Sequence, residues 1–316
     1  MVNYVIKRVL LAILTIFVIA TLVFVLSRAI PGGPFDRERP LPPTVIENLN
    51  RKYGLDQPLF NQYLLFMRNV AVLDFGISYH LLGDETVNEL IARTFPVSCL
   101  VGVWAFALAV LCGIPFGIIS ALMENRPPDV FFKIMTTLFI SIPSFVVAAL
   151  LQYTLAVRLG WLPVAMWGSW KQVVMPVIAL SAGPLATITR FTRASMREVL
   201  DSDYIRTARA KGASSFTVTY VHALRNALLP IVTVAGPMFI SIIGGSLVIE
   251  RIFALPGLGW RLVQAITGRD YSVIMGLTIF YAILLIAILL VVDLLYAFID
   301  PRIKISQGSR SSEGGD

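Results

Sequence analysis

The chain has 316 residues, of which 57% are hydrophobic and only 14% are charged. Soluble domains carry about 25% charged residues, so this composition excludes a soluble globular protein and indicates a polytopic membrane protein. The net charge of +7 does not by itself point to nucleic acid, because the basic residues lie mostly at the ends of apolar segments, where membrane topology requires them.

Six charge-free segments reach or approach the length of about 20 apolar residues that a membrane-spanning helix needs. They cover residues 9–27, 94–123, 134–157, 172–189, 226–249 and 271–292. The first follows Lys7 and Arg8 and is too long for the apolar region of a cleaved signal peptide, so residues 1–27 are expected to form a retained signal anchor. The sequence therefore predicts an all-α membrane protein with six transmembrane helices.

Residues 28–93 form the only sizeable segment that is expected on the external side of the membrane, and they are too few for an independent domain. Thr44 is positioned to cap a short helix that ends at Lys52, and Pro58 is positioned to start another. This second helix would have an apolar face made of Phe60, Leu64, Leu65 and Met67. We expect a small external helical segment here.

The distribution of Lys and Arg predicts that both termini lie in the cytoplasm. In the short segments, basic residues are more frequent on the side of the N-terminus, and long segments such as 28–93 cross the membrane largely regardless of their charge. Five further spans then form a core over residues 94–305. Residues 306–316 are expected to be disordered by their composition.

The cytoplasmic segment 190–225 is the most polar part of this core. Its sequence predicts a short helix that begins near Asp203, capped by Asp201 or Ser202, and ends at a left-handed Gly212. Ser214 or Ser215 would cap a second helix. Basic residues recur through the segment, at Arg190, Arg193, Arg197, Arg206, Arg209, Lys211 and Arg225. The segment is either a docking device for a cytoplasmic partner or an amphipathic loop that lies on lipid headgroups.

Motifs for catalysis are absent from the sequence. It contains no G-x-x-x-x-G-K-[ST] phosphate loop and no H-E-x-x-H pair, and its only histidines are His80 and His222. We therefore expect no enzyme activity and no metal or cofactor in this chain. Asp293 is an acid within the last apolar segment, which is either a proton relay or a structural residue close to the cytoplasmic surface.

The residues DYIRTARAKGASS and HALRNALLP of segment 190–225 strongly resemble the cytoplasmic "EAA" loop of the permease subunits of ATP-binding-cassette importers, in the form found in peptide transporters. Upstream, PGGPF, KYGLDQPLFNQY and DFGISY resemble the external segment of oligopeptide permeases. Downstream, GGSLVIERIFALPGLGWRLVQAITGRDYSVIMG and DLLYAFIDPRI resemble the end of the same subunits. The B-type permease of oligopeptide and dipeptide importers resembles the chain most closely. Arg206 and Thr207 depart from the first letters of the general motif, whereas Ala208 and Gly212 match it.

The resemblance implies a type I importer fold and a set of partners. These are a second homologous permease that shares the translocation pathway, two cytoplasmic ATPases that bind ATP and Mg²⁺, an external peptide-binding protein and the peptide itself, in the bacterial inner membrane and without nucleic acid. It implies that the coupling loop contacts an ATPase through Asp203, Tyr204, Arg206, Ala208, Arg209, Gly212, Ala213 and Phe216. It does not identify residues that touch the substrate.

The outer segment 250–270 is expected, by the same resemblance, to face the binding protein. Its docking residues would be Phe253, Leu255, Pro256, Leu258 and Trp260, which cluster around a predicted tight turn. The alternative is a re-entrant plug packed on its own spans. For the whole chain, the alternatives are a secondary peptide transporter driven by protons through Asp293 and a membrane scaffold with a basic docking loop.

Overall fold

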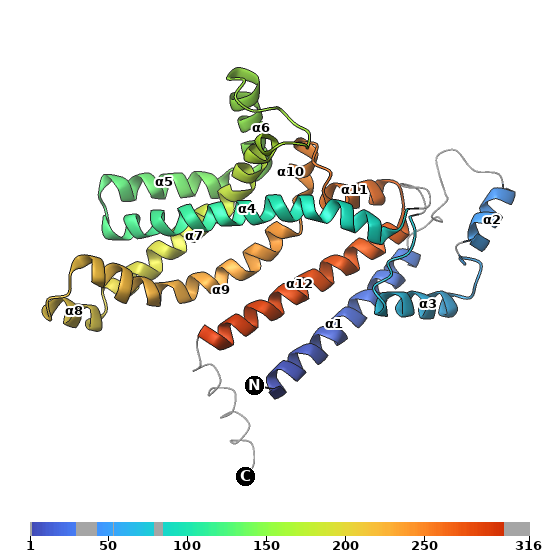
Figure 1. Ribbon diagram of the computed structural model, residues 1–316, viewed down its shortest axis with the longest axis horizontal. Helices are drawn as coiled ribbons and strands as arrows, with labels where there is room; N and C mark the ends of the chain where they lie inside the picture. Colours follow the sequence, from blue (N-terminus) through green and yellow to red (C-terminus); the bar gives the residue numbers. More distant parts are fainter. Residues whose placement is uncertain (1, 30–42, 53, 79–84, 300–316) are drawn as a thin grey trace, which may run out of the picture. The chain divides into compact units, whose positions relative to one another are not determined.

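A computed structural model describes residues 2–29, 43–52, 54–78 and 85–299, and these residues form helices joined by turns, with one isolated β-bridge between Ile77 and Thr86. The chain divides into two compact units (Figure 1). Unit 1 combines residues 1–87 with residues 269–316, and unit 2 is the continuous stretch 88–268. The expected disordered tail 306–316, the PGGPF motif and the side chain of Asp293 lie outside what is described.

Unit 1 contains α1 (Val2–Ala29), α2 (Pro43–Lys52), α3 (Leu59–Ala71) and α12 (Tyr271–Ile299). The two long helices α1 and α12 lie side by side, although they come from opposite ends of the chain (Figure 1). Ser27 near the end of α1 donates a hydrogen bond to the Met275 sulfur of α12, at 3.3 Å. The predicted helix ending at Lys52 and the predicted start of α3 after Pro58 are both confirmed.

The side of α3 that packs within unit 1 is not the apolar face noted in the sequence. Phe60, Leu64 and Leu65 are exposed, whereas Gln62 and Val70 are buried. Val70 packs with Ala20 of α1 and Ile279 of α12, with Phe66 and Met67 beside them. Helix α3 carries apolar residues on both sides, so hydrophobic periodicity alone does not show which side packs within unit 1.

Unit 2 is built around α7 (Trp170–Leu200), which packs against its neighbours α5 (Pro127–Ser141), α6 (Ser144–Leu151) and α9 (Leu224–Ile243). The long helix α4 (Val87–Leu122) approaches α7 through Gly113 and Gly117. A Cβ atom at Gly117 would overlap Thr192 of α7, and one at Gly113 would lie 3.0 Å from Ile188. Glycine at these two positions therefore permits the close helix contact on which this unit depends.

Prolines inside the long helices of unit 2 do not end them. Pro96 and Pro115 lie inside α4, Pro176 and Pro184 inside α7, and Pro230 and Pro237 inside α9. The exception is the third predicted span. There α5 and the stretch Ser144–Arg158, which comprises α6 and the π-helix η1 (Gln152–Arg158), meet at a bend of 103° around Ile142-Pro143.

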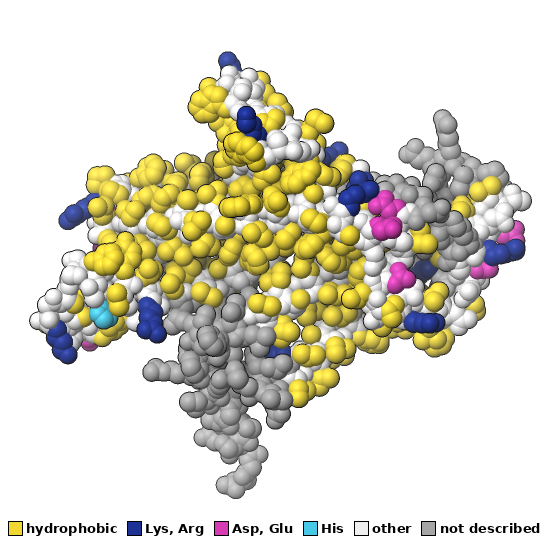
Figure 2. Space-filling model, viewed as in Figure 1, with side chains coloured by type: hydrophobic (Ala, Val, Ile, Leu, Met, Phe, Trp, Pro, Cys, Tyr) yellow, Lys and Arg dark blue, Asp and Glu magenta, His cyan; other side chains and the backbone are white. Residues whose placement is uncertain are grey.

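Five helices of the described chain are long and apolar enough to cross a membrane, and the bent pair makes a sixth if it counts as one span. On the face shown in Figure 2, hydrophobic side chains cover the middle of α4 and α5, while Lys and Arg side chains gather toward the helix ends. An apolar exterior with charge at its ends is the pattern of helices surrounded by lipid. The all-α, multi-span fold class is confirmed.

The two segments singled out by the sequence lie at opposite ends of unit 2. At one end is α8 (Asp203–Ala210), which precedes the π-helix η2 (Thr217–Ala223) and α9 (Figure 1). At the other end are α10 (Leu247–Ile252) and α11 (Leu258–Thr267). Between them lie helices that are long and apolar enough to cross a membrane.

Candidate coupling and docking sites

The polar segment 190–225 is shorter as a loop than the sequence suggested. Helix α7 runs on to Leu200, so that Arg190, Arg193 and Arg197 belong to its last turns. After α8, a turn leads through Gly212 into a helical stretch that continues through η2 into α9. What the sequence presented as one long loop is thus the end of one spanning helix, a short crossing helix and the start of the next.

The ends of α8 follow the prediction, with one difference in the cap. Ser202 is the N-cap residue, but its side chain does not cap the helix, since its hydroxyl donates back to the Val199 carbonyl oxygen. Gly212 adopts φ +86°, which confirms the predicted left-handed stop. The Ser214 hydroxyl accepts a hydrogen bond from the Thr217 backbone N–H at 3.2 Å, which confirms it as the cap of the following helix.

One side of α8 is fixed to the core of unit 2. Ile205 is fully buried in a cluster with Ile118 of α4, Met196 of α7 and Ala223. The Tyr204 hydroxyl accepts a hydrogen bond from the Asn226 side chain of α9 at 2.7 Å. Three spanning helices therefore hold α8 in place, and the sequence analysis missed Ile205, the single apolar side chain that anchors it.

The other side of α8 is open to solvent. Of the predicted coupling residues, Ala208 and Ala213 are half-buried, and the exposed ones are Asp203, Tyr204, Arg206, Arg209, Gly212 and Phe216. Phe216 packs its ring on Tyr220 with centroids 4.7 Å apart, although Phe216 remains 70% exposed. A rigid crossing helix with one buried anchor and a charged, partly aromatic outer face is suited to insertion into a complementary groove. The coupling role of these residues stays a prediction.

A buried acid beside this segment was not found from the sequence. Asp129 of α5 is completely buried and accepts two hydrogen bonds from Arg193 of α7, at 2.7 Å and 3.1 Å. Lys133 lies 2.8 Å away, and the Ser120 hydroxyl of α4 and the Asn125 backbone N–H also donate to the carboxylate. This cluster, named the Asp129 network here, ties α4, α5 and α7 together.

A second ion pair joins the same elements. Arg197 of α7 pairs with Glu124, which follows α4, and lies 3.8 Å from Asp201. Arg193 and Arg197 therefore form ion pairs with acids of their own chain. The sequence had suggested that they add positive charge to a docking surface, but these ion pairs neutralise that charge. No local pattern could have shown this for Arg193, because its acidic partner lies 64 positions away.

At the opposite end of unit 2, the outer segment folds back onto the spans. Phe253, Leu255 and Leu258 are buried, in part against Val97 of α4 and Met175 of α7. The Phe253 carbonyl oxygen also accepts a hydrogen bond from the Met166 backbone N–H at 2.9 Å. These three side chains match the packing alternative, and they are not presented to a partner within this structure.

Pro256 and Trp260 remain half-exposed, with the Arg251 guanidinium 5.1 Å above the Trp260 ring. They are the members of the predicted docking set whose side chains a partner could reach. Whether the segment docks an external protein stays a prediction.

Glu250 holds this outer segment in shape. It is buried, and its carboxylate accepts hydrogen bonds from the Ser98 hydroxyl of α4 at 2.6 Å and from the Trp260 backbone N–H at 2.9 Å. The Ser98 hydroxyl oxygen in turn accepts the Leu258 backbone N–H at 2.9 Å. A Cβ atom at Gly257 would overlap the Glu250 carboxylate. The turn therefore closes around one buried acid.

Comparison with protein families identifies the chain as the transmembrane subunit of a transport system. Residues 113–305 match the family described as the inner membrane component of binding-protein-dependent transport systems, and residues 1–100 match the N-terminal membrane component of such systems. The chain belongs to this family.

Curated relatives match along almost the whole chain. It is 48% identical over 305 residues to the dipeptide transport system permease protein DppB of Bacillus subtilis, covering 96% of this chain and 99% of that protein. It is 44% identical over 306 residues to the oligopeptide transport system permease protein OppB of Escherichia coli K12, covering 96% and 100%. Both relatives are permease subunits, which agrees with the family resemblance predicted from the motifs.

The fold is also found among solved structures. An inward-facing form of the MetNI methionine ABC transporter has a chain that matches with a TM-score of 0.57 and 18% identity, covering 67% of this chain and 96% of that one. A second match, to an amino acid ABC transporter, has a TM-score of 0.53 and 18% identity, covering 66% and 93%. These likenesses concern the fold alone.

Proposed function

We propose that this chain is the transmembrane subunit of an ATP-driven importer of dipeptides or oligopeptides in the bacterial inner membrane. The observation that carries the proposal is the 48% identity to a dipeptide permease over 96% of the chain. The crossing helix α8 supports it, since a rigid, anchored helix with an exposed polar face supplies the mechanical element that such a subunit requires.

In this proposal α8 lies in a surface groove of a cytoplasmic ATPase, and both chain termini lie in the cytoplasm. A second homologous permease completes the pathway, each of two ATPases binds ATP and Mg²⁺, and an external peptide-binding protein docks on the opposite side, near Pro256 and Trp260. Closure of the ATPases would move α8, and with it α4, α7 and α9, on which Ile205 and Tyr204 rest. ATP would thereby bias which of two pathway states is populated.

The energy source separates this proposal from a proton-driven transporter that uses Asp293. We expect peptide uptake into proteoliposomes, which contain the complete complex and its binding protein, to require internal ATP. Uptake should persist when a protonophore collapses the proton gradient at constant ATP, and Asp293→Asn should retain it. Loss of uptake on adding the protonophore would instead support the secondary transporter. A membrane scaffold would give no uptake under either condition.

The left-handed turn after α8 offers a test of the coupling role. Nothing lies within 4 Å of the place that a Cβ atom would take at Gly212, so a substitution there strains only the backbone. A β-branched residue held at positive φ costs about 1–3 kcal/mol. We expect Gly212→Val to redirect the chain after α8 and to lower both ATPase co-purification and peptide uptake severalfold.

Gly212→Asn is the matched control, because asparagine tolerates the left-handed region far better than valine does. It should behave nearly as the unmodified protein, at equal membrane expression. If Gly212→Val shows full co-purification and uptake, the geometry of this turn is not needed for coupling.

A further inference from the structure

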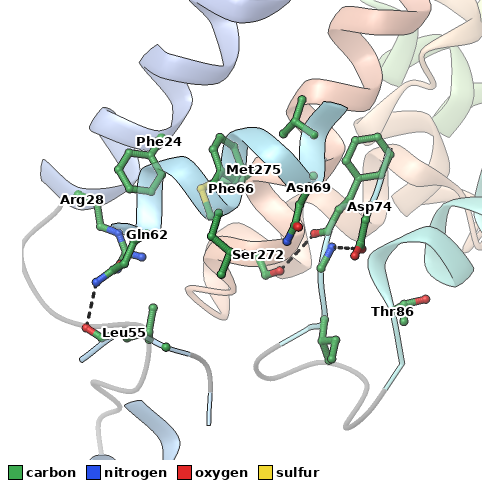
Figure 3. Close-up of a pocket in the computed structure, with 17 residues that line it drawn as sticks. Phe24, Arg28, Leu55, Gln62, Phe66, Asn69, Asp74, Thr86, Ser272 and Met275 are labelled. Atoms are coloured by element: carbon green, nitrogen blue, oxygen red, sulfur yellow. Dashed lines mark hydrogen bonds between the residues drawn. The ribbon is translucent and has the colours of Figure 1, made fainter. Parts of the chain in front are cut away.

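Unit 1 contains a cavity of about 390 Å³ that the coupling and docking sites do not use. Its walls come from α1, α3, the turn at residues 74–77 and the start of α12 (Figure 3). The volume lies within the range of small-molecule sites in proteins. In the proposed orientation this part of unit 1 lies at the external ends of the spans, so the cavity would be reached from outside.

One end of the cavity carries a cationic group and an amide with unmet hydrogen-bonding capacity. The Arg28 guanidinium lies 5.5 Å from the centre of the Phe24 ring, and its Nε atom is buried without a hydrogen-bond partner in the described part of the chain. Gln62 is 8% exposed, and its Nε2 atom donates to the Leu55 and Gln57 carbonyl oxygens, at 3.1 Å and 2.7 Å. Its Oε1 atom is buried and, among the described residues, likewise unpaired.

Unpaired buried polar atoms of this kind are costly unless something binds them. The Arg28 Nε–H is a donor and the Gln62 Oε1 atom is an acceptor, and both line the same cavity. A ligand that brings an anionic group to Arg28 together with an N–H or O–H for Gln62 would satisfy both. A purely apolar ligand would leave both unsatisfied, and the Arg28 charge disfavours a simple cation.

The other side of the cavity carries an acid. Asp74 lies across the pocket from Arg28 in Figure 3 and accepts a hydrogen bond from the Gly76 backbone N–H at 3.0 Å. An ionised carboxylate can accept about four hydrogen bonds, so Asp74 retains capacity for a ligand. Opposite charges therefore face the same space from two sides.

Aromatic and thioether side chains of Phe24, Phe66 and Met275 supply the apolar part of the lining. A glycine keeps α12 close to the turn, since a Cβ atom at Gly276 would lie 2.8 Å from Phe75 and from Val87. The space is thus bounded by packed elements of unit 1, with polar groups at two sides and apolar walls between them.

We infer that this cavity binds a small zwitterion, with its anionic group at Arg28 and its ammonium group at Asp74. Two sources offer this chemistry: a free amino acid or short peptide from outside, and the headgroup of phosphatidylethanolamine. The inference goes beyond the proposed function, because it assigns a binding site to the external part of unit 1 rather than to the translocation pathway.

Binding is tested on the purified complex in nanodiscs, without the external binding protein. The probe is dialanine, and the bilayer contains only phosphatidylglycerol, which lacks an ammonium group. We expect saturable binding in equilibrium dialysis that falls about ten- to hundredfold in Arg28→Met and in Asp74→Asn, since each removes a hydrogen bond to a charged group. The matched controls Arg68→Met and Asp56→Asn change exposed charges of unit 1 outside the cavity lining and should bind as the unmodified complex does.

Blocked peptides assign the two ends of the ligand. N-acetyl-dialanine lacks the ammonium group, so it should bind weakly and equally to the unmodified complex and to Asp74→Asn. Dialanine amide lacks the carboxylate, so it should bind weakly and equally to the unmodified complex and to Arg28→Met. These comparisons separate ligand contacts from misfolding, because a misfolded variant would lose every probe.

The lipid source is tested by native mass spectrometry of complexes purified from membranes that contain phosphatidylethanolamine. Retention of this lipid by the unmodified protein and both controls, but not by Arg28→Met or Asp74→Asn, would assign the site to the headgroup. The inference is overturned if neither dialanine nor this lipid distinguishes the two cavity variants from their controls. ATP-driven uptake is measured separately, so failure here would leave the proposed function untouched.

Discussion

Asp129→Asn is expected to destabilise unit 2 and to uncouple ATP hydrolysis from peptide uptake. The carboxylate is completely buried, and Arg193, Lys133, Ser120 and the Asn125 backbone N–H all direct hydrogen bonds or charge toward it. Hydrogen bonds to a charged group contribute about 1.5–3 kcal/mol each, and the asparagine amide keeps only one acceptor oxygen for these donors. The thermal midpoint of the purified complex and the ratio of uptake to hydrolysis are the measurements.

The control is Glu198→Gln, which removes an exposed acid from α7 and should leave the midpoint nearly unchanged. The double variant Asp129→Leu with Arg193→Met is expected to recover much of the stability, since an apolar pair can replace a buried ion pair. If it recovers stability but not coupling, the charges themselves have a role in the motion. A midpoint unchanged in Asp129→Asn would contradict the structural role of the network.

Glu250→Leu is expected to abolish uptake by releasing the outer segment. The substitution leaves the Ser98 hydroxyl and the Trp260 backbone N–H without their acceptor. Hydrogen bonds to a charged group contribute about 1.5–3 kcal/mol each. We therefore expect limited proteolysis to cut the segment 250–270 faster in Glu250→Leu than in the unmodified protein, together with a fall in the thermal midpoint.

Glu250→Gln provides the graded comparison, because its amide keeps one acceptor oxygen and presents N–H groups to the second site. Its protease sensitivity and thermal midpoint should lie between those of Glu250→Leu and the unmodified protein. Ile266→Ala on the exposed side of α11 is the position control. Equal protease sensitivity in Glu250→Leu and the unmodified protein would show that the turn is held by apolar packing alone. Leu258→Asp tests the same packing, since Leu258 is buried, and Trp260→Ala is the sharper test of docking.

Features set by local chemistry were predictable from the sequence. Apolar length gave the spans, and the need for positive φ after α8 identified Gly212, which has φ +86°. The position of a helix break is not predictable in this way, because a proline inside a spanning segment does not reveal whether the helix continues. Pro115 and Pro184 lie within continuous helices, whereas the chain bends by 103° next to Pro143.

The predicted length of the polar loop was wrong for a different reason. Between Arg190 and Leu200 the basic side chains made α7 look finished, but Thr192, Ser195 and Met196 are buried on the other side of the same helix. A helix with small polar and apolar residues on its inner face and arginines on its outer face can leave the membrane without ending. Hydropathy averaged over all residues does not separate these faces.

Contacts across long sequence separations account for most of what remained unpredicted. Ser98 and Glu250 lie 152 positions apart, and Asp129 and Arg193 lie 64 apart. Each of these residues, taken alone, looks like an ordinary polar group at the end of an apolar segment. Their roles follow only from the packing of α5 against α7 and of the outer segment against α4.

Unit 1 is built from two segments that are far apart in the chain, and this affects how the protein folds during synthesis. Its helix α1 is synthesised before the whole of unit 2, whereas α12, against which it lies, is synthesised after it. The continuous unit 2 can begin to pack while synthesis proceeds, since domains generally fold as units in the order of their synthesis. Helix α1 therefore has only α3 of unit 1 to pack against until α12 is made, and a chain that stops before residue 271 would leave the α12-facing side of α1 uncovered.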